Sequence, residues 1–460
     1  MSTTETTSQR PRLKYEGKVM LAPMVRIGTL PMRLLALDYG ADIVYTEELI
    51  DWKLLRSIRR PNEVLGTVDY IDRTDGTIVF RSCPRERDRV VLQLGTCDSN
   101  RALQVARMVQ HDVAGIDVNM GCPKKFSMMG GMGAALLKNR DRAKDILTTL
   151  VNGIDIPVTC KIRVLSNVEE TLELCENLLS TGISAIAVHG RTTDERPQHP
   201  NRNNFLREIA GRLPIPVIAN GGSKEIESHR DILKFKADTE CSSVMLARAA
   251  EWNCSIFRKD GILPIEDVIK AYLKYAVDYD NSPSNTKYCV QNILRDLQET
   301  PFGRKFLNAQ TLEQICDVWQ MGEYCRSKRK EYLENGLQGR FQVVPMSLDN
   351  SRGVKRKYDN DDVIVMNCSF LRNNYTSDID LPKTRLLKWI RENKKEMPTY
   401  DTWKEDKLFR SIVIVDQKKY SSSFWEKNKK WAEQGAALVS LCSLGVIDTK
   451  SLIRSGNLLA

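Results

Sequence analysis

The sequence predicts a (β/α)8 TIM barrel, followed by a helical domain and a small α-β-β-β-α domain. Three observations support this order. Short apolar runs alternate with helical patterns up to about residue 250, a stretch with helical patterns alone covers 262–332, and a basic region with a new pattern begins at Val363. Eight strands that alternate with helices over roughly 230 residues are typical of this barrel.

Eight apolar runs of strand length make up the expected barrel. They cover 18–24, 42–49, 90–95, 115–121, 157–163, 185–191, 216–222 and 242–248. Helical patterns lie between them at 30–39, 100–110, 140–151, 168–181, 203–212 and 225–235, while 51–89 is longer and irregular. A doubly wound open sheet is the alternative. That fold usually carries G-x-G-x-x-G after its first strand, and this motif does not follow Met24.

Changes of pattern divide the chain into four segments. We expect a catalytic barrel at 15–258, a helical domain at 259–335, a linker at 336–362 and a small domain at 363–447. The linker contains KRK at 355–357, which indicates a solvated connection, with a nuclear-import patch as the alternative. In the small domain, 363–370, 398–403, 408–416 and 418–425 have strand patterns, and 382–393 and 426–445 have helical ones.

The charge is unevenly spread. The chain carries a net charge of +10, and 382–446 alone holds 14 Lys and Arg against 8 Asp and Glu, a difference of +6. Such a basic module favours an acidic polymer, RNA or DNA, as its partner, with a solubility surface as the alternative.

The cysteines, the histidines and the apolar runs indicate the cellular compartment of the protein and whether it holds a metal site. The 12 cysteines form no C-x-x-C pair, the first residues contain no apolar signal core, and no apolar run reaches membrane-spanning length. We therefore expect reduced thiols and a cytoplasmic protein without a membrane partner, with a minor nuclear or other pool left open. Only four histidines are present and H-E-x-x-H is absent, so we expect no metal site.

Polar or glycine-containing groups end nearly every predicted strand. In a TIM barrel the active site lies at these carboxyl ends, so the groups are expected in one layer. The set comprises Ala22, Pro23, Met24, Glu47, Glu48, Gln93, Asn119, Cys122, Lys161, Arg163, His189, Arg191, Asn220, Gly221, Gly222, Ala247 and Arg248. We interpret this layer as an active site.

The last two strands end in groups that suit a phosphate. Asn220-Gly221-Gly222 and Ala247-Arg248 supply backbone N–H groups and a cation where barrels commonly hold one, although a tight turn is the alternative for the glycines. Lys161 and Gln93 suit the polar edge of a planar cofactor that becomes anionic on reduction. An ordinary ion-paired lysine is the alternative for Lys161. His189 is either a ring or phosphate contact or a structural histidine.

Cys122 follows a strand end in the stretch GIDVNMGCPKK (115–125). A thiol at a barrel mouth acts as a nucleophile, a metal ligand or a proton donor. Because no histidine and no second cysteine lies near it in the sequence, a general acid fits best, with an inert rim cysteine as the alternative. Glu47 and Glu48 either reach a substrate or pair with Arg56 or Arg59, and we favour the pairing.

Several motifs resemble those of the tRNA-dihydrouridine synthases, which are flavin enzymes with a barrel and a helical domain. They are APMVRIGTLPMR (22–33), DVNMGCP (117–123), CKIR (160–163), VHGR (188–191), NGG (220–222) and LAR (246–248). The last domain resembles a double-stranded RNA-binding domain in PTY (398–400), KKY (418–420) and KKWAEQGAA (429–437). A synthase joined to that module is similar to the eukaryotic subtype that modifies position 20 in the D-loop of cytoplasmic tRNA.

The resemblance implies a role for each residue of the layer. NADPH reduces FMN, the flavin N5 gives hydride to C6 of a uridine, Asn119 and Arg191 hold the substrate, and Cys122 protonates C5. The implied FMN contacts are Ala22, Pro23, Met24, Gln93, Lys161, His189, Asn220, Gly221, Gly222, Ala247 and Arg248. A small-molecule flavin oxidoreductase and a non-catalytic RNA-binding adaptor are the alternatives.

The basic module supplies candidate tRNA contacts. Lys427, Lys429 and Lys430 fall at the start of its last helix, where such a module meets phosphates, and Arg385, Lys388 and Lys394 lie on or beside its first helix. The loop at 404–407 is short and lacks the usual His and Pro, and Ser421 to Phe424 replace the usual glycines. We therefore expect weaker or differently placed RNA binding, with tRNA as the partner of a monomer.

Overall fold

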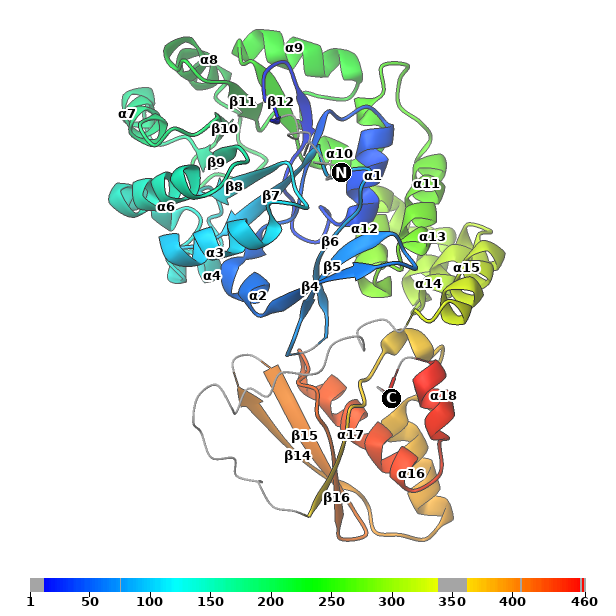
Figure 1. The fold of residues 1–460 in the computed structure, drawn as a ribbon. Helices are drawn as coiled ribbons and strands as arrows, with labels where there is room; N and C mark the ends of the chain where they lie inside the picture. The colour runs from blue at the N-terminus through cyan, green and yellow to red at the C-terminus, as the bar shows by residue number, and fades with distance from the viewer. Residues whose placement is uncertain (1–11, 75, 338–361, 406–407, 456, 459–460) are drawn as a thin grey trace, which may run out of the picture. The chain divides into compact units, whose positions relative to one another are not determined.

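The computed structural model describes residues 12–74, 76–337, 362–405, 408–455 and 457–458 (Figure 1). The chain divides into two compact units. One unit comprises 1–55, 82–275 and 288–295, and the other comprises 56–81, 276–287 and 296–460. Among the described residues, no helix has the length and apolar character needed to cross a membrane.

The predicted (β/α)8 barrel is confirmed. Its strands are β1 (Val19–Leu21), β2 (Ile43–Tyr45), β7 (Val90–Gly95), β8 (Gly115–Asn119), β9 (Val158–Arg163), β10 (Ala185–His189), β11 (Val217–Asn220) and β12 (Ser243–Leu246). Neighbouring strands pair in parallel, and the pairs β1–β12 and β2–β7 close the ring. The short strand β3 (Leu49–Ile50) adds a second parallel contact to β7. Each of the eight barrel strands lies within one of the eight predicted runs.

Helices follow the strands and surround the barrel (Figure 1). The predicted helices correspond to α1 (Leu30–Asp38), α3 (Ser99–Val109), α6 (Arg140–Gly153), α7 (Val168–Leu179), α8 (Asn203–Arg212) and α9 (His229–Thr239). The last of these begins four residues later than predicted. Ser228 and Asp231 form a capping box there, which satisfies the first N–H groups of the helix and sets its start.

The interior of the barrel is filled by side chains from alternate positions of its strands. Met20, Ile43, Val91 and Met245 are among the buried residues of this cluster, together with the ring of Tyr45. Tyr15, which precedes the first strand, packs into the same cluster. The barrel is therefore a packed core, and its chemistry is confined to the strand ends.

The irregular segment 51–89 forms a helix and an antiparallel sheet. Helix α2 (Asp51–Leu55) leads into β4 (Ser57–Asn62), β5 (Thr67–Asp72) and β6 (Ile78–Ser82), in the order β4-β5-β6. Arg81 pairs with the buried carboxylate of Asp69, its Nε lying 2.6 Å from Oδ1. The segment had no clear period in the sequence because burial does not alternate along these strands: in β5 the four consecutive residues 69–72 are all buried.

The region 262–332 is helical, as predicted. After the short helix α10 (Arg248–Trp252), the helices are α11 (Ile265–Asp278), α12 (Pro283–Leu294), α13 (Pro301–Asn308), α14 (Leu312–Val318) and α15 (Gly322–Glu334). The buried ring of Trp319 packs edge-on against Phe302 and Phe306, with ring centroids 5.4 and 5.3 Å away. These aromatic contacts connect the chain after α14 to α13.

The C-terminal domain has the predicted α-β-β-β-α order. It contains α16 (Pro382–Glu392), β14 (Thr399–Glu405), β15 (Leu408–Val415), β16 (Lys418–Ser422) and α17 (Lys429–Ser443), and α18 (Thr449–Arg454) follows. The strand-like segment at 363 is also confirmed, because β13 (Val363–Met366) pairs in parallel with β16. The KRK stretch of the predicted linker lies outside the described residues.

Candidate active site

Parallel pairing brings the predicted polar residues together at the carboxyl end of the barrel. Asn119 lies opposite Lys161 in the β8–β9 pair, and Arg163 lies opposite His189 in the β9–β10 pair. His189 in turn lies opposite Asn220 in the β10–β11 pair. Residues up to 101 positions apart in the sequence therefore form one continuous layer.

Cys122 sits in a tightly built turn. The side-chain oxygen of Asn119 accepts hydrogen bonds from the backbone N–H groups of Gly121 (2.9 Å) and Cys122 (3.1 Å). Gly133, which follows helix α4 (Lys125–Met129), packs against this turn. Its φ is +57°, and a Cβ at Gly133 would lie 2.7 Å from the carbonyl oxygen of Cys122. The turn holds the half-buried thiol at the barrel mouth.

The surroundings of Cys122 keep its thiol protonated. Burial raises the pKa of the thiol, and the nearby Glu48 carboxylate raises it further, while hydrogen bonding and the charge of Lys124 act in the opposite direction. The net pKa lies above the ordinary value. A thiol in that state can donate a proton, which agrees with the general-acid interpretation.

Glu48 is a site residue that the sequence reasoning misjudged. The favoured pairing of these glutamates with Arg56 is wrong, because Arg56 pairs with Asp72 at 2.9 Å within the antiparallel segment. Glu47 accepts a hydrogen bond from the backbone N–H of Arg26 (2.9 Å). Burial raises the pKa of Glu48, against the opposing effects of Cys122, Lys124 and Asn119. The available signal was its place directly after the second barrel strand.

Gln93 and Asp117 form a buried polar pair beneath the mouth. The Gln93 Nε2 donates to Asp117 Oδ2 (2.8 Å), and the Thr159 hydroxyl donates to Oδ1 (2.7 Å). Burial raises the pKa of Asp117 to about 6. Since its amide nitrogen is held by Asp117, Gln93 can offer its oxygen to a ligand. Sequence reasoning did not single out Asp117.

Lys161 is an uncompensated cation in the same layer. Burial and the neighbouring Arg163 lower its pKa to about 8, against the opposing effect of Asp117 and Cys122. Within the described part of the chain, no carboxylate lies at ion-pair distance from it. The predicted alternative of an ordinary ion-paired lysine therefore has no partner in this structure.

The glycines after β11 form a close-fitting turn. Gly221 has a φ of +116°, and a Cβ there would lie 2.0 Å from Asn201 Oδ1 and 2.8 Å from His189 Cδ2. A Cβ on Gly222 would lie 2.6 Å from the ring of Phe235. The Asn220 amide donates to the carbonyl of Met245 (2.8 Å) and joins this turn to the last strand.

Arg191 braces the glycine turn. Its guanidinium donates to the carbonyls of Gly221 (2.7 Å) and His199 (2.8 Å), and Nη1 lies 3.3 Å from His189 Nε2. The residue was predicted to bind substrate, and these contacts occupy two of its donors. Burial and the surrounding cations hold the pKa of His189 well below its usual value, so the imidazole is neutral.

Arg248 adds a further cation beside this turn. Burial lowers its pKa, with Glu251 as the opposing charge, and no carboxylate of the described residues lies within ion-pair distance. Its neighbour Ala247 precedes α10. Strand β12 pairs with β1, and just after β1 the Ala22 N–H donates to the carbonyl of Leu246 (2.8 Å). The turn with Pro23 and Met24 therefore lies at the same end of the barrel. Lys161, Arg248 and the glycine turn at Gly221 and Gly222 together fit an anionic group such as a phosphate, and we call them the anion cradle.

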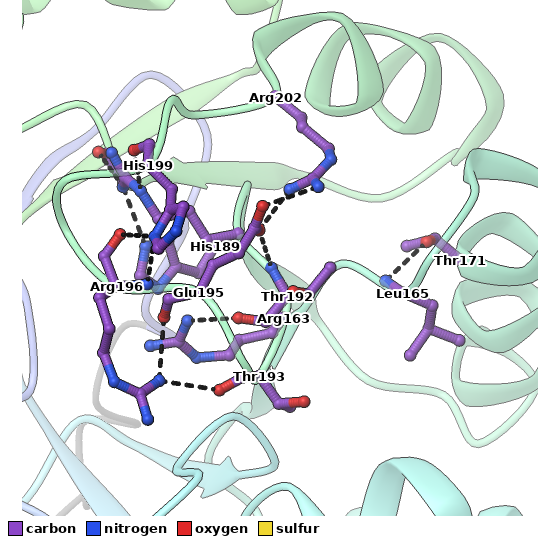
Figure 2. A network of polar contacts seen from close by, with 12 residues as sticks. Arg163, Leu165, Thr171, His189, Thr192, Thr193, Glu195, Arg196, His199 and Arg202 are labelled. Atoms are coloured by element: carbon purple, nitrogen blue, oxygen red, sulfur yellow. Dashed lines mark hydrogen bonds and ion pairs between the residues drawn. The ribbon is translucent and has the colours of Figure 1, made fainter.

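A second set of polar contacts links the Cys122 turn to the loop after β10. Arg163 donates to the carbonyls of Gly121 (2.9 Å) and Thr192 (2.9 Å). Glu195 orders that loop by accepting from Thr192 N–H (2.7 Å) and from the Arg202 guanidinium (2.8 Å), as Figure 2 shows. Arg163 was predicted only as a member of the strand-end layer.

The six predicted RNA contacts are all exposed. Lys427 precedes α17, and Lys429 and Lys430 occupy its first turn, where Asn428 caps the helix by accepting from Trp431 N–H. Lys429 lies 3.8 Å from Glu433, and Lys388 lies 3.9 Å from Glu392. Arg385 and Lys388 lie on α16, and Lys394 follows it. Exposed pairs at such distances contribute little to stability, so Lys388 and Lys429 can exchange these carboxylates for a polyanion.

Comparison with known proteins gives two family matches. Dihydrouridine synthase (Dus) matches residues 20–278, and double-stranded RNA binding motif matches residues 382–444. A solved structure titled tRNA-dihydrouridine(20) synthase dsRBD domain is 47% identical, covers 18% of this chain and 89% of its own, and has a TM-score of 0.18.

Two yeast proteins named tRNA-dihydrouridine(20) synthase [NAD(P)+] are similar to this chain. The protein from Schizosaccharomyces pombe is 43% identical over 293 residues, which cover 62% of this chain and 60% of that protein. The protein from Saccharomyces cerevisiae is 34% identical over 343 residues, which cover 70% and 88%. With a family match over more than half of its length, and with the Cys122 turn and the anion cradle at one barrel mouth, the chain belongs to the dihydrouridine synthase family.

Proposed function

We propose that this protein is an FMN-dependent tRNA-dihydrouridine synthase that uses NADPH to reduce the C5–C6 double bond of a D-loop uridine, at position 20, in cytoplasmic tRNA. The observation that carries the proposal is the juxtaposition of a protonated Cys122 thiol with an anion cradle in one barrel mouth. The names of both yeast relatives and the double-stranded RNA binding motif support the substrate.

The residues of the mouth suit FMN. Gly221 and Gly222 let the turn pack closely against Asn201 and Phe235 and present its backbone to a phosphate, and Arg248 supplies a charge that has no ion-pair partner among the described residues. Gln93 and Lys161 would hold the polar edge of the ring, and the remaining contacts would come from Ala22, Pro23, Met24, His189, Asn220 and Ala247. When bound, reduced FMN supplies the hydride that C6 of the uracil takes up. The cation of Lys161 favours the anionic form of the ring.

Cys122 completes the reduction by giving its proton to C5. The S–H bond breaks, a C–H bond forms, and the thiolate is reprotonated from solvent. Asn119 sets the position of the thiol through its two backbone hydrogen bonds, and we assign the binding of the base to its amide nitrogen and to Arg191. The Arg163 bridge keeps the turn against the loop after β10.

The base must leave the folded tRNA before it can reach the barrel mouth. Extruding a stacked nucleotide costs a few kcal/mol, and backbone contacts offset this cost. We assign those contacts to the helical domain (259–335) and to the basic face of the domain at 363–447, with the barrel at 15–258 holding the cofactor. The protein acts as a monomer in the cytoplasm, and 336–362 links its parts.

One assay tests the proposed function. Purified protein is incubated with NADPH and unmodified tRNA, and dihydrouridine is measured by mass spectrometry, with free uridine as the comparison substrate. The proposal predicts a yellow protein that modifies tRNA alone. Turnover of free uridine would indicate a small-molecule flavin enzyme, and a colourless, inactive protein would indicate an RNA-binding adaptor.

Substituting Gly221 with alanine is expected to abolish tight FMN binding. The residue needs a positive φ, and the added Cβ would collide with Asn201 and His189. We expect at least a tenfold loss of affinity, about 1.4 kcal/mol, in a flavin fluorescence titration of the apoprotein. Gly211→Ala is the control, since a Cβ there meets open space. An unchanged affinity of Gly221→Ala for FMN would show that the glycine turn is not part of the FMN site.

Charge reversal at Lys429 and Lys430 is expected to weaken tRNA binding. Loss of two phosphate contacts lowers affinity more strongly at low than at high salt. The measurement is the dissociation constant of Lys429→Glu/Lys430→Glu for tRNA at two salt concentrations. Lys234→Glu/Lys236→Glu, on α9 of the barrel, is the matched control, and equal affinities in the three proteins would disprove this assignment.

A further inference from the structure

Three large apolar residues are exposed at the mouth of the barrel. Trp52 is 60% exposed, Phe126 is 49% exposed and Met129 is 78% exposed. Trp52 belongs to α2, which follows β3, and the other two belong to α4, which follows β8 and the Cys122 turn. Both helices therefore begin beyond the carboxyl ends of parallel strands, on the side of the barrel that holds the candidate active site. We call these three residues the rim patch.

The two halves of the rim patch lie on one side of the mouth, where α2, α3 and α4 follow β3, β7 and β8 (Figure 1). Strand β7 pairs with both β3 and β8. The Arg101 guanidinium, on α3, lies over the Trp52 ring, 4.8 Å from its centroid, and donates to Cys97 Sγ (3.4 Å). A Cβ on Gly131, two residues after Met129, would lie 3.5 Å from Cys97 Cβ. A continuous set of contacts therefore leads from Trp52 to the end of α4.

The position of Trp52 is fixed by a buried carboxylate. Its backbone N–H donates to Asp51 Oδ1 (2.6 Å), and Arg101 Nε donates to Oδ2 of the same side chain (2.8 Å). The Thr96 hydroxyl also donates to Oδ2 (2.8 Å). Asp51 thus holds both the tryptophan backbone and the guanidinium that lies over its ring. Because the ring is already placed, a planar ligand that stacks on it orders few additional groups.

Stability does not explain the rim patch. An apolar side chain that remains in contact with water gains little from the hydrophobic effect, although single examples are common on protein surfaces. Here Phe126 and Met129 are three positions apart on one helix, so they share a face, and Trp52 lies on the same side of the mouth. Neighbouring exposed apolar groups of this kind mark a surface that binds a partner.

The charges beside the rim patch indicate the kind of partner. Lys53 follows Trp52, and the exposed Lys124 and Lys125 directly precede Phe126. In the part of the chain that the structure describes, no carboxylate lies at ion-pair distance from these three lysines. Apolar rings beside such cations suit a ligand with flat apolar faces and a row of negative charges. Unpaired nucleotides of RNA have this chemistry, because their bases stack on aromatic rings and their phosphates attract lysines.

We propose that the rim patch stacks on the unpaired bases that flank the target uridine, with Trp52 as the main contact. That the target is a uridine of tRNA rests on the proposed function. Extrusion of one base exposes the faces of its neighbours to water, and an aromatic ring that covers one of them replaces part of the lost stacking. Lys53, Lys124 and Lys125 bind the phosphates of the same nucleotides. The rim patch therefore holds the strand open beside the barrel mouth.

The test compares affinities for tRNA. Full-length wild type, Trp52→Ala and the control Leu233→Ala are titrated into fluorescently labelled, unmodified tRNA without NADPH, and the dissociation constants are measured by anisotropy. We expect Trp52→Ala to bind about tenfold more weakly, which corresponds to about 1.4 kcal/mol. Leu233 is 53% exposed on α9, so Leu233→Ala removes a similarly exposed apolar side chain elsewhere and should bind like wild type. Trp52→Phe keeps an aromatic face and should retain most of the affinity.

A second tRNA shows whether the contact is made to a base. It lacks the two bases that flank the target uridine, and wild type and Trp52→Ala should bind it equally. Equal affinities of these two proteins for intact tRNA would overturn the proposal, and so would a loss of the same size on the tRNA without the flanking bases. Circular dichroism melting checks that each variant is folded. If Trp52→Ala does not fold, Phe126→Ala/Met129→Ala takes its place with the same expected results.

The outcomes are distinguishable from those of the proposed function. If wild type binds and modifies tRNA while Trp52→Ala binds it equally well, only the role of the rim patch is disproved. If the expected difference in affinity is found but wild type forms no dihydrouridine, the proposed reaction is wrong and the rim patch stands as an RNA-binding surface. A wild type that does not bind tRNA would contradict both.

Discussion

Substituting Cys122 with alanine is expected to slow dihydrouridine formation on unmodified tRNA by about a hundredfold to ten-thousandfold, the usual contribution of a positioned general acid. Asn119 and Gly133 would still shape the turn, because they contact its backbone rather than the thiol. FMN should therefore remain bound, and its visible absorbance should be unchanged. The measurement is the single-turnover rate of NADPH-reduced protein with tRNA.

Two further variants make this result specific. Cys122→Ser keeps a hydroxyl proton but is a much weaker acid, so its rate should lie between those of the alanine variant and the wild type. Cys442→Ala, on α17, is the control for loss of a half-buried thiol outside the barrel. Equal rates for wild type and Cys122→Ala would mean that water or another acid protonates C5.

Substituting Glu86 with alanine is expected to destabilise the barrel by about 3–5 kcal/mol, the typical effect of leaving one buried charge unpaired. Glu86 and Arg33 are both buried, and the guanidinium donates to the two carboxylate oxygens at 2.7 and 2.6 Å. Its Nη1 also donates to the carbonyl of Gly28 (2.7 Å). The pair joins α1 to the segment that leads into β7.

Thermal unfolding, followed by circular dichroism, measures this effect on the barrel transition. Arg33→Met/Glu86→Leu should be more stable than Glu86→Ala, because no charge is left without a partner. The control is Glu176→Ala, which breaks the exposed contact with Arg212 and should cost less than about 1 kcal/mol. Similar losses in Glu86→Ala and Glu176→Ala would contradict the assignment.

The parts of the fold that could be predicted are those with a local signal. The barrel strands are short apolar runs, most of them separated by helical patterns, so each of the eight was found. The strand-end layer also followed from local order, since a residue at the end of a parallel strand must lie at one end of the barrel. Boundaries set by side-chain capping were less accurate, as the later start of α9 at Ser228 illustrates.

By itself, the sequence determined the barrel, the helical region, the C-terminal α-β-β-β-α domain and the place of Cys122 at a strand end, because each of these depends on periodicity or on neighbours in the chain. Only the tertiary structure decided which carboxylate pairs with Arg33 and that Arg163 bridges two loops. These contacts join residues 29 to 53 positions apart. The partner of a charged side chain is chosen by the closure of the barrel and by the burial that follows it, and no local pattern records that choice.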